Sequence, residues 1–195
     1  MVERLARHVG ELAVLTDLDG TLAAIRPRPE DVTIVDGARE ALTALARRAA
    51  LVAVVSGRGI DDLIRIVAVP EIAYAGNHGM EFRRPGRDPA PDPDAARHRP
   101  ALERFASRFR GAFDDHDIEV EDKGVTLSLH YRRSGDRERA ARFLTGAVAR
   151  AARDDGLVPT PGRMILEIRP PVKLDKGTAA RALVAESGAR RALFM

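Results

Sequence analysis

Two aspartates separated by one residue, Asp17 and Asp19, are the residues best suited to chemistry in this sequence of 195 residues. They follow an apolar run from Leu12 to Thr16 that is typical of a buried strand, and Gly20 comes next. Two carboxylates at one strand end repel each other unless a cation joins them, and Mg²⁺ takes such oxygen ligands together with water and phosphate. One aspartate could then attack phosphorus while the other protonates the leaving oxygen. The alternative is an Asp-Gly turn that only closes the strand.

The hexapeptide DLDGTL, which begins at Asp17, resembles the first motif of the haloacid dehalogenase-like phosphatases. The resemblance implies that Asp17 is the nucleophile, that Asp19 is the general acid and base, and that both contribute to a Mg²⁺ site. It also implies that Thr21 contacts the phosphate.

A second motif of these phosphatases is a strand that ends in serine or threonine, and LVAVVSGR at residues 51–58 is similar to it. The likeness implies that Ser56 and Gly57 bind the phosphoryl group and that Arg58 binds substrate. A serine before a glycine is also a common helix cap, but its place after the second predicted strand favours the role at the phosphate.

The third motif is a lysine that neutralises phosphate, and Lys176 in LDKGTAA is similar to it. A cation at the start of a predicted helix opposes the helix dipole, which favours a functional reason for it over a surface lysine. Lys173 is the competing candidate, and we rank it below Lys176.

Within this superfamily the sequence resembles the trehalose-6-phosphate phosphatases. The loop GNHGME at residues 76–81 is similar to one that the family carries after its third strand. A later segment has the family's pattern of Glu-x-Lys, then His-Tyr-Arg, then the glutamate of LEIRP. The resemblance implies that substrate is held by Arg58, Asn77, His78, Glu121, Lys123, Arg132 and Glu167. Each charged residue taken alone is better explained as a solvated strand residue or a cross-strand ion pair, and the ordered set favours the sugar-binding role.

The family's fourth motif, an acidic GDDxTDE-like stretch, would follow a strand similar to RALFM at residues 191–195, where the sequence ends. We therefore expect the sequence to be a fragment whose sheet lacks an element. Asp17 and the main-chain carbonyl of Asp19 would then be the protein's ligands of Mg²⁺. This ion can bind through one or two carboxylates plus phosphate, so we expect a weakened rather than an absent site.

The elements around these motifs alternate between buried strands and helices. A short helix is expected at residues 1–12, strands at 12–16 and 51–56, helices at 37–50 and 60–67, and a strand with a glycine-rich loop at 71–79. This rhythm predicts an α/β fold, a Rossmann-like parallel sheet with flanking helices, whose strand-to-helix loops gather at one edge.

A change of character at Arg83 indicates an inserted domain. Residues 83–100 are rich in proline, aspartate and arginine, which predicts a loop or linker. Period-2 strands and helices then predict an antiparallel α+β unit: helices at 101–113 and 136–153, and strands at 118–124, 125–132 and 164–170. A helix at 177–187 and a strand from Arg191 return to the first pattern. We expect a catalytic core at 1–82 and 173–195, and a specificity cap at 83–172.

Composition and charge exclude other classes of protein. The chain is 45% hydrophobic and 31% charged, which is an ordinary globular balance, and no apolar run has the length of a membrane span. The lack of cysteine excludes disulfides, thiolate metal sites and a cysteine nucleophile. The pI of about 9.8 hints at nucleic acid, but the net charge is only +3 and aromatics make up 4%. We expect a cytoplasmic protein with neither a nucleic-acid nor a membrane partner; the oligomeric state stays open.

These observations predict a hydrolase of carbohydrate metabolism. The expected reaction is Mg²⁺-dependent hydrolysis of trehalose 6-phosphate, a small-molecule substrate, to trehalose and phosphate through an aspartyl-phosphate, in trehalose biosynthesis. One alternative is another capped sugar phosphatase, for example one that acts on sucrose phosphate. Another is a non-catalytic remnant that binds sugar phosphate, which the missing fourth motif would explain.

Overall fold

A computed structural model describes residues 7–26 and 31–195 of the chain. The chain divides into two compact units, one formed by Met1–Asp92 with Leu174–Met195 and the other by Pro93–Lys173. The first six residues of the expected helix at 1–12 lie outside the described part. Within the described part, Val9–Glu11 form a single turn of 3₁₀ helix, and the first strand begins directly after it.

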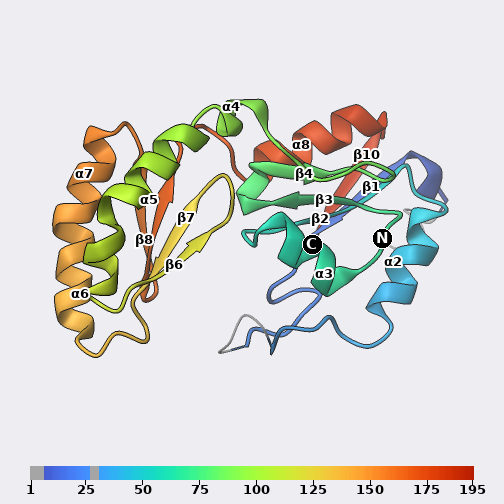
Figure 1. The fold of residues 1–195 in the computed structure, drawn as a ribbon. Coiled ribbons are helices and arrows are strands. Elements are labelled where there is room, and N and C mark those ends of the chain that lie inside the picture. The colour runs from blue at the N-terminus through green and yellow to red at the C-terminus, as the bar shows by residue number, and fades with distance from the viewer. Residues whose placement is uncertain (1–6, 27–30) are drawn as a thin grey trace. The chain divides into compact units, whose positions relative to one another are not determined.

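A six-stranded sheet in the order β10-β1-β2-β3-β4-β5 forms the centre of the first unit (Figure 1). Its strands are β1 (Leu12–Thr16), β2 (Leu51–Val55), β3 (Ala73–Gly76), β4 (Glu81–Arg83), β5 (Ala90–Pro91) and β10 (Arg191–Phe194). The first four in this order run parallel, while β4 and β5 are antiparallel. The α/β class and its parallel sheet are therefore confirmed, with two antiparallel strands added at one side.

Helices cover both faces of this sheet, which is why its central strands are continuous apolar runs. The helices α2 (Ala38–Ala46) and α3 (Ile60–Val67) pack on the face that carries Val52 and Val54. On the opposite face, α8 (Lys176–Ser187) covers the sheet (Figure 1). Its Ala179 and Leu183 pack against Leu15 and Val55. Because β1, β2 and β3 run parallel, their carboxyl ends lie at one edge of the sheet.

The expectation of an unstructured linker at residues 83–100 is wrong. Arg83 ends β4, residues 90–91 form β5, and a short helix α4 occupies Pro93–Ala96. The pairing of β4 with β3 and of β5 with β4 assigns residues 83–92 to the first unit rather than to the insertion. The prolines of this segment predicted a loop, because proline lacks an amide donor for a helix or a sheet. Proline is nevertheless tolerated on an edge strand and in the first turn of a helix.

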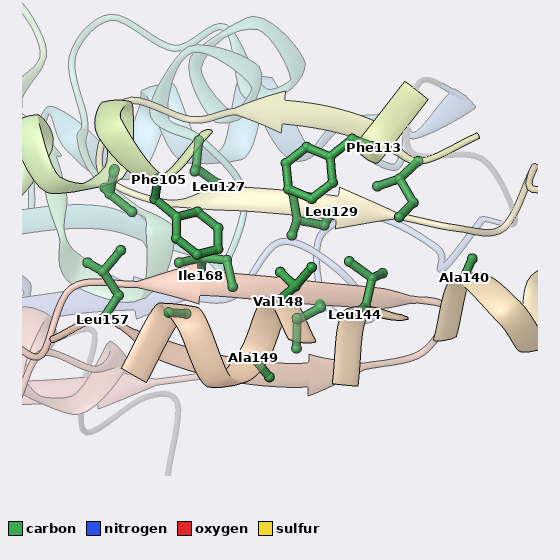
Figure 2. Close-up of a cluster of buried hydrophobic side chains, with 14 residues drawn as sticks. Phe105, Phe113, Leu127, Leu129, Ala140, Leu144, Val148, Ala149, Leu157 and Ile168 are labelled. Atoms are coloured by element: carbon green, nitrogen blue, oxygen red, sulfur yellow. The ribbon is translucent and has the colours of Figure 1, made fainter. Parts of the chain in front are cut away.

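The second unit is a four-stranded antiparallel sheet in the order β6-β7-β9-β8 with helices on one face. Its elements are α5 (Arg99–Asp114), β6 (Glu119–Asp122), β7 (Leu127–His130), α6 (Arg137–Phe143), a π-helical turn η4 (Leu144–Val148), α7 (Ala149–Asp154), β8 (Val158–Gly162) and β9 (Ile165–Arg169). Leu127, Leu129 and Ile168 point from the sheet toward Phe105 and Leu144 of the helices (Figure 2).

Two features of this unit differ from the expectations. The helix at 136–153 is interrupted by the π-helical turn, and a strand at residues 158–162 was missed. Its sequence VPTPG contains two prolines and a glycine, which argue against a strand, yet it lies at the edge of the sheet, where a proline needs no ladder partner on its outer side.

The sheet of the second unit has an apolar face and a polar face. Successive side chains on a strand point to opposite faces, so Ser128 lies on the side opposite to Leu127 and Leu129. Across the strands Ser128 is in register with Glu121 of β6 and with Glu167 of β9, and Glu167 is in register with Thr160 of β8. A row of polar groups therefore crosses this face.

Within the described residues, no helix is long and apolar enough to span a bilayer.

Candidate active site

Asp17 and Lys176 meet at the carboxyl edge of the first sheet, although they are 159 positions apart in the chain. Asp17 directly follows β1, and Lys176 is the first residue of α8. The Lys176 Nζ donates to Asp17 Oδ2 at 2.6 Å, and the amide of Leu18 donates to Asp17 Oδ1 at 2.7 Å. The Asp17 side chain is a quarter exposed, so one carboxylate is both fixed in orientation and open to a ligand.

Asp19 is held by a bidentate ion pair with Arg58. The guanidinium Nε donates to Asp19 Oδ2 and Nη2 donates to Oδ1, both at 2.8 Å, and the Arg58 side chain is only 15% exposed. Such fork-to-carboxylate pairs fix orientation as well as charge. Arg58, expected to bind substrate, here fixes the proposed acid and base. Thr21, expected at the phosphate, lies exposed in the turn beyond Gly20.

Ser56 follows β2 and is almost completely buried. Its Oγ accepts from the amide of Arg58 at 3.2 Å, and its own amide donates to Ala75 O at 2.9 Å. Ser56 does not cap a helix, because α3 begins at Ile60 with Gly59 as its N-cap, so its expected role at the phosphate stays a prediction.

The loop after β3 packs against this Ser56 loop rather than projecting away from the sheet. Asn77 is fully buried and its side-chain amide donates to the carboxylate of Glu81, although the sequence predicted that it binds substrate. The His78 ring lies over Gly57, where an added Cβ would be 2.5 Å from His78 Cε1. Gly79 has a φ of +95°, and its Cα lies so near α8 that a Cβ would be 2.7 Å from Ala179 Cβ.

This packing gives a testable contrast between two glycines. Gly57→Ala would collide only with the His78 ring, so we expect it to lower the free energy of unfolding by about 1–3 kcal/mol, and we expect His78→Ala to remove most of that loss. Gly76→Ala would place its Cβ 2.9 Å from the main-chain N and Cα of Ile60, which no side-chain truncation relieves. Urea unfolding of G57A, G57A/H78A, G76A and G76A/H78A checks this; equal costs of G57A with and without His78 would contradict it.

Three of the four residues expected to bind sugar lie on the polar face of the second unit. Glu121 accepts from His130 Nε2 at 2.9 Å and lies 3.7 Å from Lys123 Nζ. The hydrogen bond from His130, followed by the charge of Lys123, holds the pKa of Glu121 below its usual value, so the carboxylate is ionised at neutral pH. Glu167 lies next to Arg169, with Oε2 and Nε 3.8 Å apart.

Arg132 is the residue that falls outside this row, because it follows the end of β7 and is exposed. Ser128 was missed, although it lies between Glu121 and Glu167 in the sheet. It is fully buried, and its hydroxyl has no hydrogen-bond partner among the residues that the structure describes. The signal that could have found it is the alternation of LSLH, which places one serine among polar neighbours on the face opposite two leucines.

Magnesium fits the oxygen donors at the first sheet's edge only in part. Among the described residues, no group of three or more acidic or histidine side chains is arranged to hold a metal ion. Asp17 nevertheless offers a carboxylate, with the Asp19 carbonyl two residues on, and Mg²⁺ is commonly held by one or two protein carboxylates, substrate phosphate and water. The donor set therefore suits an ion bound together with phosphate, rather than an ion enclosed by protein.

A parallel sheet whose first strand ends in two aspartates, with an antiparallel α+β unit inserted into it, defines the haloacid dehalogenase-like class of fold. A solved structure described as a trehalose-6-phosphate phosphatase related protein superposes with a TM-score of 0.75 over 93% of this chain and 76% of that one, at 23% identity. The C-terminal domain of trehalose-6-phosphate phosphatase from C. albicans gives 0.68 over 90% and 62%, at 20% identity. These two likenesses establish the fold.

Sequence comparison places the chain more narrowly. The profile of the family described as trehalose-phosphatase matches residues 15–194, so the chain belongs to the trehalose-phosphatase family. A trehalose-phosphate phosphatase from Mycobacterium avium is 40% identical over 166 residues, which are 85% of this chain and 42% of that protein. A Mycobacterium tuberculosis protein described as an uncharacterized glycosyl hydrolase is 38% identical over 86% of this chain and 12% of its own length. The chain thus spans about two fifths of the phosphatase, and a smaller part of the second relative.

Proposed function

We propose that the protein hydrolyses trehalose 6-phosphate to trehalose and phosphate. The observation that carries the proposal is the contact of Asp17 with Lys176 at the sheet edge, beside Ser56 and within the trehalose-phosphatase family. A lysine 2.6 Å from an aspartate holds that carboxylate in one orientation, and it supplies a positive charge where a phosphate dianion would bind.

The reaction follows from these groups in two steps. An Asp17 oxygen attacks phosphorus and the bond from phosphorus to the sugar oxygen breaks. Asp19, once one of its oxygens has left Arg58 and carries a proton, gives that proton to the departing oxygen. Asp19 then takes a proton from water, which attacks the aspartyl-phosphate and releases inorganic phosphate. Lys176 and the Ser56 hydroxyl hold the phosphoryl oxygens throughout. Magnesium, held by Asp17 and the Asp19 carbonyl, would offset the negative charge that carboxylate and phosphate bring together.

We propose that the second unit acts as the cap that recognises the sugar. Its polar face carries Glu121, Lys123 and Glu167, and charged side chains make strong hydrogen bonds to hydroxyl groups. His130 and Lys123 keep Glu121 ionised, so that it can only accept hydrogen bonds and not donate them. Such a face suits a ligand rich in hydroxyl groups.

Phosphate release from a panel of esters, with Mg²⁺ present and after chelation, tests the proposed function. We expect kcat/KM to be highest for trehalose 6-phosphate and to fall for sucrose 6-phosphate, glucose 6-phosphate and p-nitrophenyl phosphate, and activity to disappear with chelator. A higher kcat/KM for another sugar phosphate would change the proposed substrate but leave the proposed phosphatase reaction in place. Binding of the ester without release of phosphate would indicate the non-catalytic alternative.

Lys123→Ala separates recognition of the sugar from the chemistry. We expect kcat/KM for trehalose 6-phosphate to fall by about 10–100-fold, as befits the loss of a hydrogen bond from a charged group. Activity on p-nitrophenyl phosphate, which has no sugar, should stay near wild type. Arg133→Ala is the matched control, since Arg133 is a highly exposed cation on the same unit, paired with Glu119. An equal loss of kcat/KM on both substrates would show that Lys123 does not contribute to recognition of the sugar.

A further inference from the structure

Glu81 is a buried carboxylate to which neither the sequence motifs nor the proposed reaction gives a role. It is the first residue of β4, lies opposite Gly76 of β3, and is 9% exposed. Acidic residues are rarely this buried unless they are paired or hydrogen-bonded. We therefore expect the buried Glu81 carboxylate to have hydrogen-bond partners within the first unit.

Glu81 accepts hydrogen bonds from two different loops through one oxygen. Its Oε2 accepts from the main-chain amide of Ile60 at 3.2 Å and from the side-chain amide of Asn77. Ile60 is the first residue of α3, whose N-cap, Gly59, has no side chain to satisfy the free amides. An acid at this helix terminus is also favoured by the helix dipole. Glu81 therefore caps α3 from a strand 21 residues further along the chain.

The two loops that Glu81 connects are also joined by their main chains. The amide of Asn77 donates to Arg58 O at 2.7 Å, and the amide of His78 donates to Ser56 O at 3.0 Å. Gly76 lies so close to the other loop that an added Cβ would be 3.1 Å from Arg58 O. Any shift of Asn77 or of the start of α3 therefore moves the backbone that carries Ser56 and Arg58.

Through this arrangement Glu81 acts on groups that it does not touch. Ser56 presents its hydroxyl at the sheet edge, and Arg58 holds both oxygens of Asp19. The same loop after β3 approaches the first turn of α8 at Gly79, where an added Cβ would be 2.9 Å from Asp175 O, next to Lys176. The loop therefore contacts the backbone that carries Ser56 and the backbone next to Lys176.

We propose that Glu81, together with Asn77, is a positioning residue that sets Ser56 and Arg58 for phosphoryl transfer. The proposal rests on the proposed function for its kinetic consequence, while the structural part concerns the chain alone. Asn77 is thereby reassigned from substrate binding to support of the loop, which agrees with its complete burial.

An exchange of the amide and the carboxylate between positions 77 and 81 tests this pairing, because the double variant keeps the net charge of the wild type. Asn77→Asp places two carboxylates in contact, so we expect the loop to shift and kcat/KM to fall on the order of 10²-fold, as for a misplacement of about 1 Å. Glu81→Gln keeps an oxygen for the Ile60 amide and should lose less. In N77D/E81Q the repulsion between two carboxylates is removed, and the glutamine has to turn so that its nitrogen donates to the new carboxylate while its oxygen accepts from Ile60, because in the wild type one oxygen serves both contacts. We therefore expect a substantial part of the activity to return. Glu186→Gln, at an exposed pair with Arg84, is the control.

The measurements are made on the full chain, at a temperature where every variant is folded. Kinetics on trehalose 6-phosphate are combined with the backbone amide signals of Ser56, Arg58 and Ile60 in NMR spectra without substrate. We expect these signals to move in N77D and to return in N77D/E81Q. Unmoved signals in N77D, or a double variant no better than N77D, would overturn the proposal. If the wild-type chain releases no phosphate, the proposed function fails, and the amide signals alone decide the role of Glu81.

Discussion

Replacement of Asp17 by asparagine is expected to lower phosphate release by roughly 10⁴-fold or more, the loss typical of removing a covalent nucleophile. The amide of asparagine has nearly the shape of the carboxylate but cannot form the acyl phosphate. Because Lys176 then loses its anionic partner, its charge is left for the substrate, and we expect trehalose 6-phosphate to bind the variant at least as tightly as the wild type.

The D17N experiment needs both rate and affinity to be decisive. Single-turnover phosphate release gives the rate, and calorimetry gives the affinity for trehalose 6-phosphate with Mg²⁺ present. Asp88→Asn is the matched control, since Asp88 is an exposed aspartate of the same unit and should leave both values unchanged. Wild-type turnover by D17N would remove Asp17 from the nucleophile role.

Lys176→Ala is expected to reduce kcat/KM by about 10²–10³-fold, which is the usual effect of removing one group that stabilises charge in the transition state. The variant also leaves Asp17 without its lysine, so attacking carboxylate and phosphate dianion repel each other without compensation. Both effects act on the bound phosphate, and we therefore expect KM to rise as well as kcat to fall.

The start of α8 makes this variant informative, because folding does not depend on the lysine. Asp175 accepts from the Thr178 amide at 2.6 Å, and the Thr178 hydroxyl accepts from the Asp175 amide, so a capping box holds the first turn. We expect the Tm of K176A to stay close to that of wild type. Lys173→Ala, the rival lysine, is exposed and should retain wild-type kinetics. A larger loss from K173A than from K176A would reverse the assignment.

The edge at which the candidate site forms could be predicted because its signal is local. An apolar run that ends in DLDGTL, and a second that ends in SGR, predict strands whose carboxyl ends meet. Lys176 was placed correctly at the start of a helix by its neighbours in LDKGTAA. The alternation of LSLH and LEIRP likewise predicted two strands of the second unit.

The remaining contacts could not be predicted, because they join residues that no short pattern relates. The pair of Arg58 with Asp19 spans 39 positions, and that of Glu81 with Ile60 spans 21. Asn77 was expected to bind substrate because the loop GNHGME resembles one that the family carries, but the folded chain buries it against Glu81. The strand at residues 158–162 was hidden by its prolines, since their cost depends on whether the strand lies at an edge.

The sequence by itself determined which residues carry the charges and hydroxyl groups, and on which kind of element each lies, because strand and turn preferences act over a few neighbouring residues. The tertiary structure decided which of these groups meet: Lys176 with Asp17, Arg58 with Asp19, and Glu81 with the loops on both sides of it. Those contacts depend on the order of strands in the sheet and on the side from which each helix packs, which are properties of the whole folded unit.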